Sequence, residues 1–213
     1  MRGSGCFAVM ALAVLALAAS PARAEEAAAK TEPSQAQDPG FTKRLFAADI
    51  GKQKKSYVCF VRVYDPDHLA RHPLQKVSAM KLLVAAERVP EDKLLNYSFR
   101  LGVKFRKRPG DFDSSGDCGH GRTPENAGDK AQLGCGVDCD GGGISVELTP
   151  EAKSTLVRLD SIRIWRNNKP EDEGLNLEGG ADDRVFRLDR ASLEECRSLV
   201  HDRKELAAMR TKK

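Results

Sequence analysis

Residues 95–106 read Leu-Asn-Tyr-Ser-Phe-Arg-Leu-Gly-Val-Lys-Phe-Arg, an unbroken alternation of apolar residues with polar residues or glycine. A period of two predicts a strand with one face buried and the other in water. The apolar residues on the expected buried face are Leu95, Tyr97, Phe99, Leu101, Val103 and Phe105. At roughly 3.3 Å per residue such a strand spans about 40 Å. Strands of this length usually bend, and Gly102 is a natural place for a kink in a curled sheet or barrel.

Weaker strand patterns occur on both sides of this segment, at residues 57–64, 77–87, 144–149, 155–166 and 184–189. The alanines of residues 77–87 also permit a helix, and the alternation in residues 155–166 slips near Asp160 and Ser161, which indicates a β-bulge. Short helices are expected at residues 65–72 and 191–199, because Asp65, followed by proline, and Ser192 are candidate N-caps. We therefore predict a mainly β protein, an antiparallel meander that forms a small barrel or curled sandwich.

The first 24 residues have the pattern of a secretory signal. A positively charged start is followed by an apolar run over residues 7–19, and Ala22-Arg-Ala24 supplies small residues for cleavage after Ala24. The apolar run is too short to span a bilayer, which takes about 20 residues. We expect a periplasmic or secreted protein without a membrane span.

The chain then divides by composition. Residues 25–55 are polar and are expected to be a flexible leader, residues 56–200 the β-rich domain, and residues 201–213 a charged, helix-compatible tail. Loss of Arg2 and Arg23 with the signal would lower the formal net charge from +4 to +2. So small a net charge argues against a general polyanion binder.

The most distinctive motif region, residues 117–143, combines cysteine with glycine. Ten of the eighteen glycines lie between Gly110 and Gly143, interleaved with three cysteines. In an oxidising compartment disulfides are the first interpretation. The candidates are Cys59, Cys118, Cys135, Cys139 and Cys196. Five is an odd number, so at least one is free or pairs between chains. We expect Cys118 to pair with Cys135 or Cys139 in a stapled hairpin region, and Cys59 to pair elsewhere, with Cys196 within its possible reach.

Metal binding is the alternative for the same region. Cys118, His120, Cys135 and Cys139 are donors suited to zinc, but their spacings do not match the common zinc patterns. A calcium interpretation would use Asp138, Asp140 and Glu147, and it fails the EF-hand template. We therefore expect neither a metal nor another cofactor.

Catalysis and nucleic-acid binding find little support. After the signal, the histidines are His68, His72, His120 and His201, and none lies in a pattern typical of nucleophilic catalysis. A non-enzymatic protein is the favoured interpretation. The basic residues 104–108, 52–55 and 210–213 suggest a polyanion contact, but Lys104 and Arg106 are more simply the solvated face of a strand. No nucleic-acid partner is expected.

Three strings together resemble an uncharacterised family of exported alphaproteobacterial proteins. They are Tyr-Asp-Pro-Asp-His-Leu-Ala-Arg-His-Pro ending at Pro73, Gly-Cys-Gly-Val-Asp-Cys-Asp-Gly-Gly-Gly ending at Gly143, and Asp-Asp-Arg-Val-Phe-Arg-Leu-Asp-Arg ending at Arg190. The resemblance covers residues 57–200. The family has no established activity, so it implies no catalytic or binding residue. Comparison with lipocalin-like barrels is at the level of fold only, since their Gly-x-Trp signature is missing.

Two functional classes remain open from sequence. One is an exported barrel that binds a small ligand or an envelope protein through its loop-bearing end, near the cysteine-glycine region. The other is a structural or interaction protein of the cell envelope without a ligand cavity. An open apolar cavity would favour the first and a filled interior the second. The oligomeric state stays open.

Overall fold

The computed structural model describes residues 37–51, 53–89, 94–123, 130–166 and 173–210. The expected signal peptide, most of the leader's first half and the last three residues of the tail lie outside these ranges. Within the described ranges, no helix combines the length and apolar character needed to cross a membrane.

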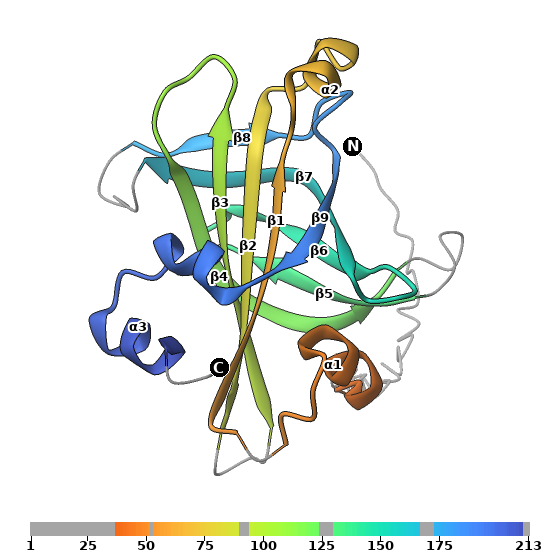
Figure 1. The fold of residues 1–213 in the computed structure, drawn as a ribbon, viewed down its shortest axis with the longest axis vertical. Helices are drawn as coiled ribbons and strands as arrows, with labels where there is room; N and C mark the ends of the chain where they lie inside the picture. The colour runs from red at the N-terminus through yellow and green to blue at the C-terminus, as the bar shows by residue number, and fades with distance from the viewer. Residues whose placement is uncertain (1–36, 52, 90–93, 124–129, 167–172, 211–213) are drawn as a thin grey trace, which may run out of the picture. The chain divides into compact units, whose positions relative to one another are not determined.

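Within the described ranges, nine antiparallel strands make up one sheet, shown in Figure 1. They are β1 (Lys55–Val63), β2 (Val77–Arg88), β3 (Leu95–Phe105), β4 (Phe112–Arg122), β5 (Ala131–Gly136), β6 (Gly142–Leu148), β7 (Ser154–Arg166), β8 (Leu175–Glu178) and β9 (Val185–Ala191). The helices are α1 (Pro39–Phe46), α2 (Pro66–Arg71), the 3₁₀ helix η2 (Leu193–Leu199) and α3 (Arg203–Arg210). The prediction of a mainly β meander with short helices near residues 65–72 and 191–199 is confirmed.

Strand β7 closes the sheet into a barrel. One edge of β7 pairs with β6 and then with the start of β4, and its other edge pairs with β9 and then with β8. Strand β9 in turn pairs with β1, so the hydrogen bonds form a ring. The register of β6 on β7 shifts between Leu159 and Ile162. This irregularity lies at Asp160 and Ser161, where the sequence indicated a bulge.

The barrel interior is packed with apolar side chains. All six residues of the alternating face of β3 belong to one continuous core, with Tyr97, Phe99, Leu101 and Val103 at most 3% exposed. Other strands contribute Phe60, Phe186 and several leucines and isoleucines with almost no exposure. Burial of each large side chain stabilises the fold by about 1.5–3 kcal/mol. The interior is thus filled by side chains along the described strands.

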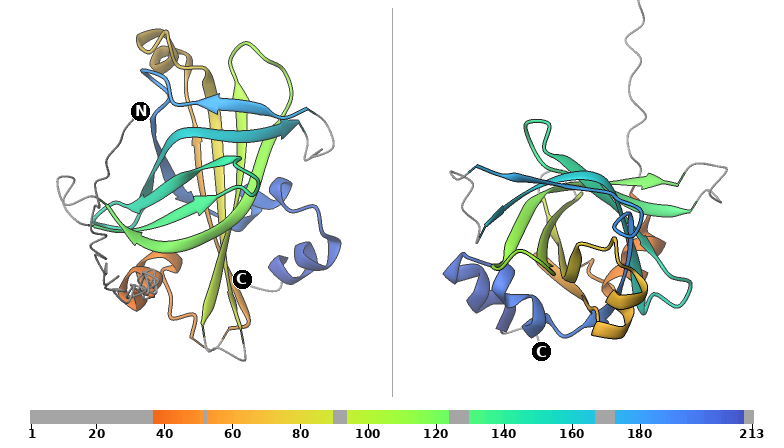
Figure 2. Two further views of the ribbon diagram at one scale, coloured as in Figure 1. Left: turned by 180° about the vertical axis from the view of Figure 1, so that it is seen from behind. Right: turned by 90° about the horizontal axis from the view of Figure 1, so that it is seen from above.

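The outer face of β1–β3 is partly covered, contrary to the expectation of one wet face. A second apolar cluster joins Cys59 and Leu83 to Cys196, Leu199 and Met209 of the C-terminal segment. A disulfide links Cys59 to Cys196 across 137 residues. Gly102 pairs in register on both sides, and a side chain there would come within 2.6 Å of Leu199 Cδ2. The glycine therefore makes room for the covering segment, which Figure 2 shows outside the ring of strands.

Residues 38–50 are folded against the barrel, so this part of the expected flexible leader was wrongly assigned. Asp38 caps helix α1 by accepting a hydrogen bond from the Phe41 amide at 2.9 Å, and Pro39 occupies the first turn. Phe41, Leu45 and Phe46 are buried in the core. The helix is too short to be stable in isolation. Its stability comes from this docking, which composition does not reveal.

Strands β4, β5 and β8 were not predicted. The glycine and aspartate residues of β4 and β5 disfavour strands intrinsically. Pairing with β3 and β6 overrides that preference, because each strand gains hydrogen bonds on both edges. Strand β8 has only four residues and one buried side chain, Leu177.

Candidate functional site

The cysteine-glycine region forms part of the barrel wall. Cys118 and Cys135 face each other in the β4–β5 pair and form a disulfide. This is one of the two pairings expected for Cys118. The glycines allow close backbone approach: a side chain at Gly116 would overlap the carbonyl oxygen of Gly136 on β5. The region is a stapled hairpin, as the sequence indicated. Two disulfides in the described chain fit an oxidising compartment.

The sequence's metal donors are not brought together. The sulfurs of Cys118 and Cys135 are bonded to each other, and Cys139 is free and exposed in the turn between β5 and β6. Glu147 is instead paired with Lys130 at 2.8 Å and with Arg158 at 3.5 Å. Among the described residues, no three histidine, cysteine or acidic side chains are grouped so as to hold a metal ion. Asp138 and Asp140 belong to the same exposed turn as Cys139.

His120 points into the interior beneath α1. Its ring lies edge-on to Phe41 and Tyr97, with centroid distances of 5.7 and 4.8 Å. Neither ring nitrogen has a hydrogen-bond partner among the described residues, and the side chain is 7% exposed. Burial lowers the pKa of His120, and the nearby Asp38 carboxylate only partly opposes this effect. The neutral imidazole therefore serves as a packing group.

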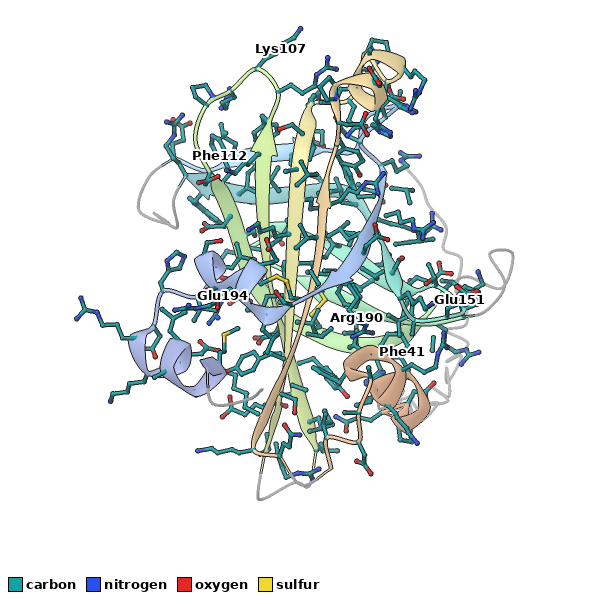
Figure 3. The ribbon with its side chains drawn as sticks, viewed as in Figure 1. Phe41, Lys107, Phe112, Glu151, Arg190 and Glu194 are labelled. Atoms are coloured by element: carbon teal, nitrogen blue, oxygen red, sulfur yellow. A yellow bond between two sulfur atoms is a disulfide. The ribbon has the colours of Figure 1, made fainter. Side chains whose placement is uncertain are left out.

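A cleft of about 560 Å³ opens at the barrel end that carries α2 and the β3–β4 loop. Three segments line it: the α2–β2 connection, the start of the β3–β4 loop, and β8. The lining residues are Pro73, Leu74, Gln75, Lys76, Phe105, Arg106, Lys107, Arg108, Leu175, Asn176, Leu177 and Glu178. Figure 3 shows Lys107 at the tip of the loop. Ligand sites in proteins commonly have volumes of about 300–1,000 Å³.

Hydrogen bonds between charged side chains and the backbone stabilise the walls of this cleft. Arg106 Nη1 donates to the carbonyl oxygens of Leu69, His72 and Gln75 at 3.1–3.4 Å, which ties the β3–β4 loop to α2. The carboxylate of Asp183, which is fully buried, accepts hydrogen bonds from the amides of Lys76 and Val77 at 2.7 and 3.2 Å. These hydrogen bonds fix the segments on either side of the cleft relative to each other.

Asp182 and helix α2 complete the same wall. Asp182 accepts from the Leu74 amide at 3.2 Å, and Asp65 caps α2 through the His68 amide at 2.7 Å. His68 stacks on His72 at 4.3 Å between ring centroids and contacts Gln75 Oε1 through Nε2 at 3.0 Å. The two histidines therefore have a structural role in the wall of the cleft.

The basic cluster of residues 104–108 divides between two roles. Lys104 forms an ion pair with Asp111 at 3.1 Å, and Arg106 is used in the cleft wall. Lys107 and Arg108 line the cleft, are exposed, and have no carboxylate partner in the described ranges. Of the other basic run, Lys55 is paired with Glu87 and Glu205. The cationic cluster was visible in the sequence, but the cleft that Lys107 and Arg108 line was not.

A second cleft, of about 550 Å³, lies between the C-terminal segment and β2–β4. Its ionisable side chains already have partners within the protein: Lys104 with Asp111, His201 with Asp113 at 3.4 Å, and Lys81 with Glu195. Such internal pairing leaves less charge to recognise a ligand. The cleft at the α2 end is the stronger candidate.

The expectation that binding occurs near the cysteine-glycine region is not met by this cleft, since none of its lining residues lies in residues 117–143. The contribution of β8 was missed altogether. The only local signal was the alternation Leu175-Asn-Leu-Glu178, which is too short to distinguish a strand from a loop. The anchoring role of Asp182 and Asp183 also has no sequence signal, because their partners lie more than 100 residues away.

Comparisons with known proteins add no further geometry: no family model, no curated protein and no solved structure matches this chain. The family suggested by the sequence motifs therefore stays a prediction.

Proposed function

We propose that this protein is an exported, non-enzymatic binding protein that holds a small ligand in the cleft between α2, the β3–β4 loop and β8. The observation that carries this proposal is a ligand-sized volume whose lining mixes apolar side chains with cations that have no carboxylate partner among the described residues. Sites for small molecules typically pair apolar walls with a few polar groups that orient the ligand. Because side chains fill the barrel interior, we propose a site at the barrel end rather than in the lumen.

A titration with the neutral apolar dye Nile red tests the proposal. We expect saturable, one-to-one binding, with enhanced fluorescence, to the protein purified from the exporting host. Asn176→Trp adds bulk on an exposed lining position of β8 and should abolish saturation. Val185→Trp introduces the same side chain at an exposed position on β9 that does not line the cleft, and should leave binding unchanged. Equal binding by both variants contradicts the proposal.

The filled interior favours a second candidate, a structural or interaction protein of the cell envelope. In that case the cleft is only a surface feature, and the dye should bind weakly and without saturation. Cross-linking in the exporting host would then yield a defined protein adduct. A one-to-one dye complex together with no adduct speaks for the small-ligand function.

Export is part of the same proposal, with the signal peptide removed after Ala24. Intact-mass analysis of the secreted protein should give the mass of residues 25–213, and reduction should add four hydrogen masses for two disulfides. Alkylation without reductant should label one thiol, Cys139. A mass that includes residues 1–24 contradicts the cleavage.

A further inference from the structure

The apolar floor of the α2-end cleft is recessed. Leu177 is 2% exposed, and Phe105 and Leu175 are half-buried and pack against the core. Leu74 is the exception at 64% exposed, and it lies at the rim on the α2–β2 connection. A recessed floor with one exposed apolar side chain suits a single narrow apolar group rather than a broad flat surface.

The rim of the cleft is cationic. Four basic residues and one carboxylate, Glu178, line it. Arg106 is committed to backbone carbonyls. Lys76, Lys107 and Arg108 have no ion-pair partner among the described residues. Glu178 accepts a hydrogen bond from Ser161 at 3.1 Å.

Two neighbouring lysines that do not line this cleft differ from these cations in having acidic partners. Lys104 and Lys81 are each paired with an acidic residue, at 3.1 and 3.9 Å. Unpaired cations gathered beside a half-buried apolar floor leave an electrostatic field that an anion can satisfy. Arginine in particular suits a planar carboxylate or a phosphate.

We propose that the ligand of this cleft is a free single-chain amphiphile with an anionic head group. Its alkyl chain lies on Phe105, Leu175 and Leu177, and its carboxylate or phosphate is held by Lys76, Lys107 and Arg108. This inference rests on the proposed ligand-binding function and specifies its ligand class. The charge complementarity favours an anion, and the recessed floor favours one free chain over a bilayer surface.

Calorimetric titrations with dodecanoate, dodecanol and dodecyltrimethylammonium, all below their aggregation concentrations, test the head group. We expect dodecanoate to bind one-to-one and at least about tenfold more tightly than the other two, which corresponds to about 1.4 kcal/mol. Raising the salt concentration should weaken dodecanoate binding, because exposed charges are screened. Equal affinity for the three probes would overturn the assignment of an anionic ligand.

Charge reversal identifies the residues. Lys107→Glu/Arg108→Glu should weaken dodecanoate binding about tenfold or more and leave Nile red binding intact. The matched control is Arg203→Glu/Lys204→Glu, which reverses two adjacent, exposed cations on α3, away from the cleft, and should change neither. Equal losses of dodecanoate affinity in both variants would attribute binding to net charge alone and overturn the proposal.

Vesicle sedimentation separates the two sources of an anionic chain. Binding to vesicles that contain anionic phospholipid, without binding of monomeric dodecanoate, would overturn the proposal in favour of a membrane surface. Nile red binding without preference for dodecanoate would refute the ligand class but leave the proposed function standing. No binding of either probe would refute both.

Discussion

Replacing Glu205 with glutamine should loosen helix α3 from the barrel wall. The Glu205 carboxylate accepts hydrogen bonds from Arg100 Nη2 at 2.7 Å and Tyr57 Oη at 3.1 Å, and lies 2.9 Å from Lys55 Nζ. Its side chain is only 12% exposed. Glutamine keeps the shape and one acceptor oxygen but removes the charge that joins α3 to β1 and β3.

The size of the effect follows from the pKa of Glu205. Burial by itself opposes ionisation, but the hydrogen bonds from Arg100 and Lys55 outweigh it and lower the pKa from 4.5 to about 2. Taken in full, this difference is worth about 3 kcal/mol. Lys55 and Arg100 are 29% and 31% exposed, so solvent screening reduces the expected loss to about 2 kcal/mol.

The pH dependence has a definite sign. Because the folded-state pKa is depressed, the contribution of Glu205 is complete above pH 4.5 and is lost as the pH falls from 4.5 towards 2. The difference in stability between the native protein and Glu205→Gln should therefore shrink over this range. A difference that stays constant from pH 7 to pH 2.5 would refute the electrostatic explanation.

Hydrogen exchange of the α3 amides is the direct assay, with urea unfolding as a measure of global stability. The matched control is Glu194→Gln, which removes the carboxylate that pairs with Arg197. The Glu194 side chain is 70% exposed. We expect faster exchange in α3 for Glu205→Gln and little change for the control. Similar exchange in α3 for both variants would show that the buried carboxylate does not hold the helix.

Three further changes probe other parts of the structure. His120→Phe should reduce the loss of stability on acidification below pH 6.5. Burial depresses the pKa of His120 in the folded state, so the unfolded chain binds the extra proton. Parallel profiles of stability against pH for the native protein and the variant, measured by urea unfolding, would contradict this. Gly116→Ala should lower the free energy of unfolding by about 3 kcal/mol or more, because the new side chain would overlap a carbonyl of β5. Gly134→Ala enters open space and should lower it by about 1 kcal/mol or less. Equal losses of stability in thermal unfolding would argue against close packing at Gly116. Arg190→Met should lower the free energy of unfolding by about 2–3 kcal/mol and expose α1 to proteolysis. The Arg190 guanidinium donates hydrogen bonds to the carbonyls of Arg44, Leu45 and Ala152, which the variant loses. Unchanged cleavage of α1 would refute this role.

Local sequence patterns predicted the elements whose own residues show a clear periodicity or a capping motif. The alternation of residues 95–106 identified the buried face of β3, because side chains alternate between the faces of any strand, whatever its neighbours. The phase slip at Asp160 and Ser161 located the bulge of β7 for the same reason. Proline and capping residues located α2. Composition misassigned α1, because three apolar residues seem too few for a helix until their docking surface is known.

The candidate site was only partly predictable. The cationic cluster was visible in sequence, but Lys104 and Arg106 were interpreted only as a solvated strand face. Their actual roles depend on Asp111, on the carbonyls around α2 and on β8. None of these partners follows from residue spacing, because the sequence does not show which distant segments meet at one end of a barrel.

The mainly β class, the long alternating strand and the stapled character of residues 117–143 were predictable from sequence patterns. These features depend on periodicity and residue type within one segment. Four features became evident only in three dimensions: β7 closes the barrel, Cys59 pairs with Cys196, α1 docks on the core, and a cationic cleft lies beside β8. Each of these depends on contacts between residues far apart in the chain, which form only when the whole sheet closes.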